Sequence, residues 1–117
     1  MPMQATDYGG AVPVDGYGPG FFRIGGEVHH GPVIATGTGA LPWGGLADAD
    51  TLLSLSGRID LLFVGMGEEI ARLPADLAAR LAEAGVMVET MSSPAAARSF
   101  NVTLAEGRRV ACALLPV

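Results

Sequence analysis

The sequence has no lysine, a single cysteine and no long apolar run. Its seven basic residues are all arginine, they are scattered along the chain, and the formal net charge is −5. Nucleic-acid binding relies on a basic stripe that neutralises phosphates, so we expect no nucleic-acid partner. The most apolar stretch, residues 59–66, is far shorter than the roughly 20 residues of a membrane-spanning helix, and it includes Asp60. We therefore predict no membrane span.

Signals for export are also missing. Cys112 has no second cysteine with which to form an intramolecular disulfide. Residues 1–20 contain no basic residue and no continuous apolar block, unlike a secretory signal peptide or an arginine-rich mitochondrial presequence. These two features predict a cytoplasmic location.

Length and composition favour one folded domain. The chain has 117 residues, of which 50% are hydrophobic, and a chain of this size buries roughly 65% of the surface that its unfolded form exposes. We therefore expect a single domain over residues 1–117. Residues 1–19 are rich in glycine and proline and predict an irregular arm or an edge strand, since Pro13 cannot donate to a central ladder.

The first third of the chain predicts an antiparallel meander. Two short β-compatible runs, residues 21–24 and 27–30, flank Gly25-Gly26, which is typical of a two-residue hairpin turn. Residues 33–36 predict a further strand. The glycine-rich residues 37–45 predict a loop, in which Trp43 is expected to cover one end of the core.

The rest of the chain alternates strands and helices. Short apolar runs at residues 61–64, 86–88 and 110–114 predict buried strands. Apolar residues at three- and four-residue steps over 68–84 predict a helix, regular from Pro74 onward. A short helix is expected from an N-cap at Asp48, and a longer one from an N-cap at Ser93. The resulting βαβαβ order favours parallel pairing, so we expect an α/β fold with a mixed sheet.

No set of side chains forms a recognisable catalytic or metal-binding motif. His29 and His30 are neighbours on a predicted strand and so point to opposite faces, which prevents both from binding one metal ion. Cys112 alternates with apolar residues of a predicted strand, so a buried and unreactive thiol is expected. We therefore predict a protein that is not an enzyme and has neither a metal nor a cofactor.

Two features leave open a ligand site at the carboxyl end of the sheet. Gly65-Met66-Gly67 follows a buried strand, where free backbone N–H groups can hold an anion. Glu68-Glu69 would repel a phosphate there, so a simple tight turn is the favoured interpretation. Arg98 and Asn101 share one helix face that Thr90 can approach, and this polar cluster either holds a partner or small anion or ties the helix to a loop. Tethering is favoured. The candidate residues are Gly65, Gly67, Thr90, Arg98 and Asn101.

Several strings together resemble one family of small domains. They are Gly16-Tyr17-Gly18 with Phe22-Arg23-Ile24, the loop ending in Trp43, residues 62–67, and above all the tail from Met91 with Arg98, Asn101 and Ala105-Glu106-Gly107-Arg108. The family is one of unknown function that includes the mitochondrial complex I assembly factor 3 and the adipogenesis-associated protein, and the chain is similar to a bacterial member. Pro94 and Phe100 depart from the glycine and tyrosine that are common in relatives.

The resemblance implies a three-layer mixed α/β fold, with no established activity and no cofactor. It implies a protein-interaction domain, of the kind that serves as an assembly or biogenesis factor, whose partner is another protein. The alternative is a protein that binds a small molecule or anion at the five residues named above. The sequence leaves homo-oligomerisation open.

Overall fold

The computed structural model describes residues 8–117, which form two sheets and three helices. A three-stranded sheet has the order β1-β2-β3, and a five-stranded sheet has the order β5-β4-β8-β6-β7. The strands of the first sheet are β1 (Val14–Gly18), β2 (Phe21–Ile24) and β3 (Glu27–His30). Those of the second are β4 (Val33–Thr36), β5 (Gly39–Pro42), β6 (Leu61–Gly65), β7 (Val88–Met91) and β8 (Val110–Leu114). The helices are α1 (Ala49–Leu53), α2 (Ala75–Glu83) and α3 (Ser93–Ala105).

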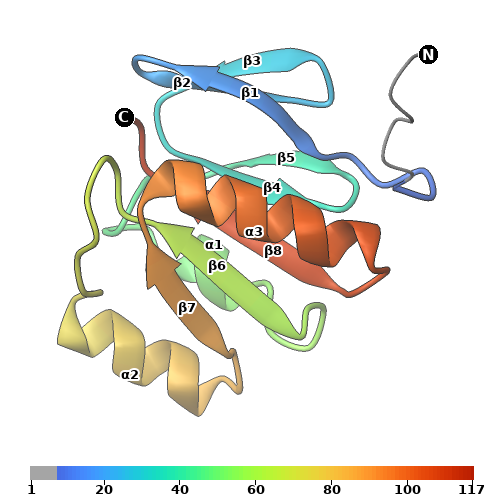
Figure 1. The fold of residues 1–117 in the computed structure, drawn as a ribbon. Helices are drawn as coiled ribbons and strands as arrows, with labels where there is room; N and C mark the ends of the chain where they lie inside the picture. Colours follow the sequence, from blue (N-terminus) through green and yellow to red (C-terminus); the bar gives the residue numbers. More distant parts are fainter. Residues whose placement is uncertain (1–7) are drawn as a thin grey trace, which may run out of the picture.

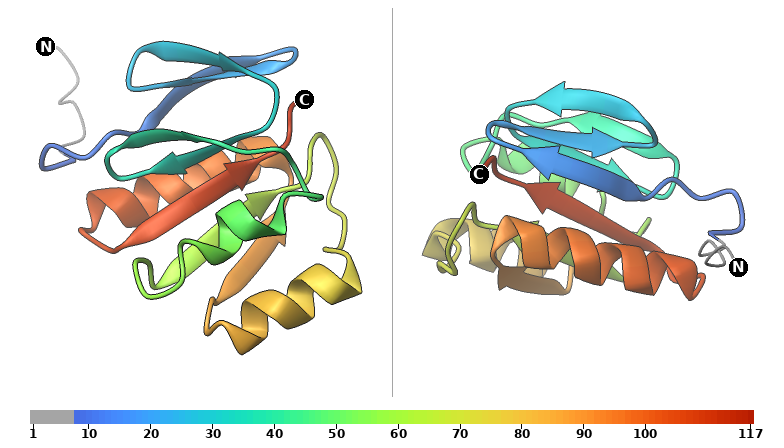
Figure 2. Two further views of the ribbon diagram at one scale, coloured as in Figure 1. Left: turned by 180° about the vertical axis from the view of Figure 1, so that it is seen from behind. Right: turned by 45° about the horizontal axis from the view of Figure 1, so that its top comes forward.

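The elements stack in three layers, as Figures 1 and 2 show. The five-stranded sheet is the middle layer. Helices α1 and α2 pack on one face through a cluster that includes Leu52, Leu77 and Leu81. On the other face α3 and the three-stranded sheet lie side by side, and they share a second cluster that includes Phe22 and Phe100. The mixed, three-layered α/β fold expected from the sequence is thus confirmed.

The predicted βαβαβ half is confirmed. Strand β6 pairs in parallel with β7 on one side and with β8 on the other. All five residues of β6 and all five of β8 are buried, because both strands lie inside the sheet and are covered on both faces. The antiparallel meander is confirmed for β1 to β3, where Gly25 and Gly26 turn the chain with φ of 57° and 84°.

Several predicted elements differ from the structure. Residues 37–45 are more than a loop, since Gly39–Pro42 forms the edge strand β5 against β4. The strand expected at 86–88 begins only at Val88. Residues 68–74 are not helical, which leaves Ile70 79% exposed rather than on a buried helix face. The apolar spacing over 68–84 predicted too long a helix, because α2 begins only after Pro74, which is its N-cap residue.

The start of α3 is also shifted by one residue. Ser92 is the N-cap, and its hydroxyl accepts a hydrogen bond from the Ala95 N–H at 3.4 Å. Ser93, which was expected to cap the helix, lies inside the first turn with no exposed surface. The shorter helix α1 begins as predicted, because the Asp48 carboxylate accepts from the Thr51 N–H.

The N-terminal segment, for which an irregular arm or an edge strand was expected, contains both within its described residues. Residues 8–13 are irregular, and β1 then forms an edge of the three-stranded sheet. Residues 1–7 lie outside the described part of the chain. Trp43 is buried as expected, and its indole N–H donates to the Asp48 carbonyl at 3.1 Å.

Candidate functional site

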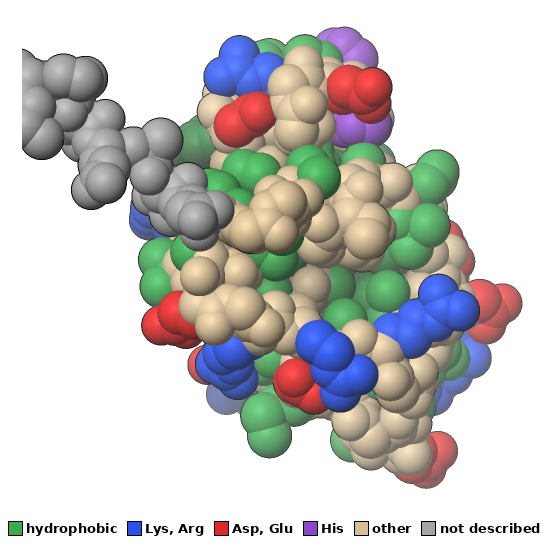
Figure 3. Space-filling model, turned by 90° about the vertical axis from the view of Figure 1, so that its right-hand side faces the viewer, with side chains coloured by type: hydrophobic (Ala, Val, Ile, Leu, Met, Phe, Trp, Pro, Cys, Tyr) green, Lys and Arg blue, Asp and Glu red, His purple; other side chains and the backbone are tan. Residues whose placement is uncertain are grey.

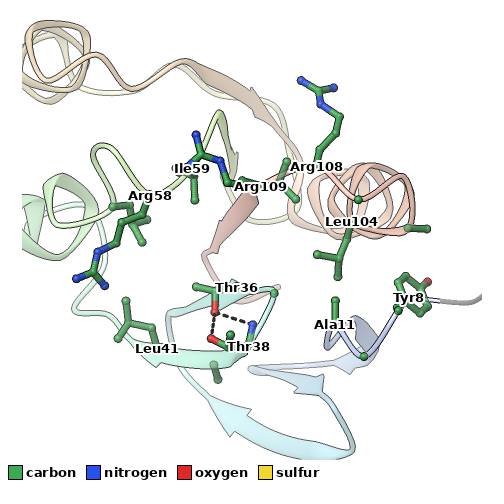
Figure 4. A pocket seen from close by; sticks show the side chains of 18 of the residues that line it. Tyr8, Ala11, Thr36, Thr38, Leu41, Arg58, Ile59, Leu104, Arg108 and Arg109 are labelled. Carbon is green, nitrogen blue, oxygen red and sulfur yellow. Dashed lines mark hydrogen bonds between the residues drawn. The ribbon is translucent and has the colours of Figure 1, made fainter.

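A large hollow in the described part of the chain opens at the end of the molecule where β8 begins and α3 ends (Figures 3 and 4). Its volume is about 1010 Å³. Four segments form its walls: residues 8–11, the β4–β5 turn, the loop between α1 and β6, and the chain from the end of α3 into β8. We call it the arginine-rimmed cavity, for the reason given below.

The walls of the cavity are fastened to one another by backbone hydrogen bonds. The Val12 N–H donates to the Gly37 carbonyl at 3.0 Å, which ties the N-terminal segment to the β4–β5 turn. The Asp60 N–H donates to the Arg109 carbonyl at 2.8 Å, which ties the α1–β6 loop to the start of β8. The cavity is therefore formed before any ligand arrives, as most binding pockets are.

The cavity combines an apolar interior with a cationic rim. Leu41, Leu55, Ile59, Leu104 and Val110 contribute apolar surface. Three of the chain's seven arginines, Arg58, Arg108 and Arg109, also line it, whereas no aspartate or glutamate within residues 8–117 does. In a chain of net charge −5 this is a local reversal of charge, and such a region attracts anionic groups.

Among the acids in residues 8–117, one is hydrogen-bonded to an arginine of this rim. The Arg109 guanidinium donates to the Asp60 carboxylate at 2.7 Å and 3.4 Å. This hydrogen bond lowers the pKa of Asp60, and the same contact raises the pKa of Arg109. Within residues 8–117, Arg58 and Arg108 make no side-chain hydrogen bond or ion pair. The charge of Arg108 also helps to lower the pKa of Asp60, but its guanidinium, like that of Arg58, keeps its hydrogen-bond donors available at the rim.

The predicted turn Gly65-Met66-Gly67 is closed by a serine. The Gly67 N–H donates to the Ser93 hydroxyl at 2.9 Å, and that hydroxyl donates to the Leu115 carbonyl at 2.6 Å. A side chain at Gly65 would lie 2.6 Å from the Ser93 Cα, so only glycine fits there. The glycines thus allow β6 to approach the first turn of α3 closely.

The other three predicted site residues point in different directions. Asn101 binds the backbone of Val14 in β1 through both polar atoms of its amide. Arg98 is exposed and lines a smaller hollow of about 370 Å³ together with Phe63, Glu89 and Val102. Thr90 is half-buried in β7. The tethering favoured for Asn101 is observed, whereas a ligand site made of all five residues stays a prediction.

The histidines and the cysteine lie where the sequence placed them. On β3, His30 is exposed and contacts the Phe21 ring, while His29 is partly buried opposite Phe22. Cys112 is completely buried in β8, and burial raises the pKa of its thiol. Within residues 8–117 no three histidine, cysteine, aspartate or glutamate side chains gather in a way that could hold a metal ion.

Sequence reasoning missed the arginine-rimmed cavity. The only available signal was Arg108-Arg109, the single adjacent pair of basic residues, followed directly by a buried strand. The other walls come from residues 8–11, 36–41 and 54–59, which no local motif connects. Their proximity results from the order of strands in the sheet.

Several known proteins are similar to this chain in sequence. An uncharacterized protein of Rhodobacter capsulatus is 53% identical over all of this chain and 94% of its own length. The NADH dehydrogenase (ubiquinone) 1 alpha subcomplex assembly factor 3 of Danio rerio is 30% identical over 97% of this chain and 69% of its own length. The human assembly factor of the same name is 27% identical, and the match spans 61% of its length.

Solved structures show the same architecture. A Bartonella henselae protein described as an outer membrane protein has a TM-score of 0.81, with 38% identity over 92% of this chain and 97% of that one. A Bordetella pertussis protein described as a Mth938-like domain has a TM-score of 0.79, with 26% identity over 99% and 92%. In this chain, no helix within residues 8–117 has the length and apolar character to cross a membrane.

The family comparison covers nearly the whole fold. A family model described as "Protein of unknown function (DUF498/DUF598)" matches residues 14–115, from the first residue of β1 to just past the end of β8. The animal relatives with a named role are assembly factors. The chain belongs to the DUF498/DUF598 family.

Proposed function

We propose that this protein is a non-catalytic assembly or biogenesis factor that acts by binding another protein. The observation that carries the proposal is the similarity to an assembly factor of Danio rerio over 97% of the chain. The similarity covers the segments that form the arginine-rimmed cavity as well as the core. A subunit of an NADH dehydrogenase is the first partner to test, because the relatives' name specifies that complex. The cytoplasmic location and a single domain over residues 1–117 stay predictions.

The chemistry of the chain supports binding over catalysis. Cys112 is completely buried and its pKa is raised, so its thiol is protonated at neutral pH and out of reach of a substrate. Ser93 is buried and both donates and accepts a hydrogen bond with the backbone. These are the roles of residues that hold a scaffold together.

The proposal is tested by purifying the protein with its partners from its native cell. A tag belongs at the C-terminus, which lies at the other end of the molecule from the cavity (Figure 1). We expect the tagged chain, at native expression level, to migrate in a complex larger than its own 11.9 kDa and to recover one protein in fixed ratio. A tag on that protein should recover this chain in return. A chain that migrates alone, with no reciprocal recovery, would contradict the proposal.

A second function, the binding of a small anion, is favoured by one observation. Arg98, one of the five candidate residues from the sequence, is exposed and lines the smaller hollow between α3 and β7. A thermal-shift screen with small carboxylates and phosphates would show a stabilised protein, and Arg98→Ala would remove the shift without loss of the fold. Equal shifts in both proteins would eliminate this candidate.

A further inference from the structure

We propose that the arginine-rimmed cavity binds an exposed segment of a partner protein in which large apolar residues alternate with acidic ones. This inference rests on the proposed protein-binding function and adds to it a surface and a partner chemistry. It follows from three features of the cavity: its apolar interior, the excess of positive charge among the described residues that line it, and the direction in which two of its arginines point.

Apolar side chains line the interior of the cavity. Leu41 and Ile59 are partly buried and line the hollow together with Leu104, which is almost fully buried. Figure 3 shows hydrophobic side chains inside the hollow at this end of the molecule. Apolar side chains of a ligand that enter the hollow remove this surface from water, which favours binding. The volume of about 1010 Å³ reaches the upper end of the range for small-molecule pockets, roughly 300–1,000 Å³, and so has room for several side chains.

The rim has positive charge that the described residues do not neutralise. Within residues 8–117 no carboxylate lines the cavity, and Asp60, which precedes β6, is hydrogen-bonded to Arg109. Arg58 and Arg108 have no hydrogen-bond or ion-pair partner within residues 8–117. Guanidinium groups pair well with carboxylates, often through two hydrogen bonds. The ligand is therefore expected to bring acidic groups to the rim.

The direction of the arginines favours a peptide over a small amphipathic molecule. Figure 4 shows that Arg58 and Arg108 extend from two different walls and point outward from the hollow. The head group of a small ligand held inside the cavity lies away from both of them. A peptide that crosses the mouth places apolar side chains inside and acidic side chains next to each arginine. Charge at the rim of such an interface sets partner choice and association rate.

The test is a selection of random 12-residue peptides displayed on phage, performed on the full-length protein. We expect the enriched peptides to contain large apolar residues flanked by aspartate or glutamate. The double variant Arg58→Glu with Arg108→Glu should weaken binding of a selected peptide at least tenfold. The variant Ala40→Trp, which fills the hollow from an exposed position of β5, should weaken it similarly without a change in charge.

A matched control separates the cavity from general electrostatics. Arg72→Glu with Arg80→Glu makes the same change in net charge at exposed positions outside the cavity. It should leave the affinity for the selected peptide within about twofold, because salt screens charges that lie far from the cavity. All variants are compared only after circular dichroism and thermal unfolding show that they are folded.

Four results would overturn the inference. The selection could enrich no peptide, or it could enrich basic or uncharged peptides. The variant with both rim arginines replaced could bind a selected peptide as well as the unsubstituted protein does. Finally, decanoate could displace every selected peptide and bind the cavity more tightly than the peptides do. The last result would assign the cavity to a small amphipathic anion. If the tagged protein still recovers a native partner in any of these cases, the proposed function stands and only this surface is wrong. If it recovers none, both fall.

Discussion

Asn101 of α3 holds the backbone of Val14 of β1 through two hydrogen bonds. Its amide nitrogen donates to the Val14 carbonyl at 2.7 Å, and its amide oxygen accepts from the Val14 N–H at 2.9 Å. The two residues are 87 positions apart in the sequence. The pair is therefore the polar link that fastens the three-stranded sheet to the helix beside it, next to the shared cluster around Phe22 and Phe100.

We expect Asn101→Ala to lower the free energy of unfolding by about 1–3 kcal/mol, because it leaves the Val14 N–H and carbonyl without a partner in a partly buried place. Urea denaturation measures the loss, and hydrogen exchange should show faster exchange of the Val14 amide. The neighbouring Val102→Ala changes an exposed side chain and serves as the control. Equal effects of the two substitutions would contradict this role of Asn101.

Ser93 and Ser92 should respond differently to removal of their hydroxyl groups. Ser93→Ala is expected to cost about 1–3 kcal/mol of stability, since the buried Gly67 N–H and Leu115 carbonyl lose their partner. Its signature is lost hydrogen-exchange protection at Gly67. Ser92→Ala should instead cost about 1 kcal/mol, as the loss of an N-cap does, and it should affect the Ala95 amide. Protection lost at Ala95 in the Ser93 variant would mean that Ser93 is the cap.

The serine pair shows what the sequence could and could not predict. The pattern Ser-Ser-Pro places a helix start within one residue, but either serine satisfies the capping rule. Which serine caps the helix depends on the close approach of Gly65 to Ser93 and on the hydrogen bond from Ser93 to the carbonyl of Leu115, 22 positions later in the sequence. Strands β6 and β8 were predictable because each is a continuous apolar run. Strand β5 was not, since Gly39-Ala40-Leu41-Pro42 has little β propensity and pairs with β4 because the tight turn before it brings it alongside.

The arginine-rimmed cavity was beyond prediction for a similar reason. Its walls come from four separate segments, and each segment alone has an ordinary explanation. Arg108-Arg109, for example, follows the carboxyl end of a helix, where positive charge is favourable in any case. Only the strand order β5-β4-β8-β6 places the β4–β5 turn beside the start of β8.

Acid should destabilise the protein partly through Asp48. The Thr51 hydroxyl, 2.7 Å from its carboxylate, and the Gly44 N–H lower the pKa of Asp48 below its usual value of 3.8. The unfolded chain then binds a proton more readily than the folded chain, so this contribution to stability is complete above about pH 4. It is lost as the pH falls through the folded-state pKa.

The check is urea denaturation of Asp48→Asn between about pH 6 and pH 3. We expect this variant to be less stable near neutrality and to lose less stability on acidification than the unsubstituted protein. The control is Asp76→Asn, an exposed residue in the first turn of α2. An acid response of the Asp48 variant as steep as that of the unsubstituted protein would contradict this role.

Cys112 should react with thiol reagents only when the protein unfolds. Its side chain is completely buried in the central strand β8, and burial raises its pKa, so neither access nor ionisation favours reaction. We expect labelling by Ellman's reagent to be very slow in native buffer and to accelerate in parallel with global unfolding in urea. A variant with Cys112→Ala and Ala79→Cys carries an exposed thiol on α2 and should react at once. Fast labelling of native Cys112 would reveal local opening of the sheet.

The most direct test of a protein-binding cavity is photo-cross-linking in the native cell. A photoreactive amino acid is placed at Ala40, at the cavity, or at Ala79, on the outer surface of α2. We expect the probe at Ala40 to cross-link one specific protein through an acidic, apolar segment, and the probe at Ala79 to leave that protein unlabelled. Absence of a specific cross-link at Ala40, or the same set of products from both positions, would contradict the claim that the cavity binds a partner protein.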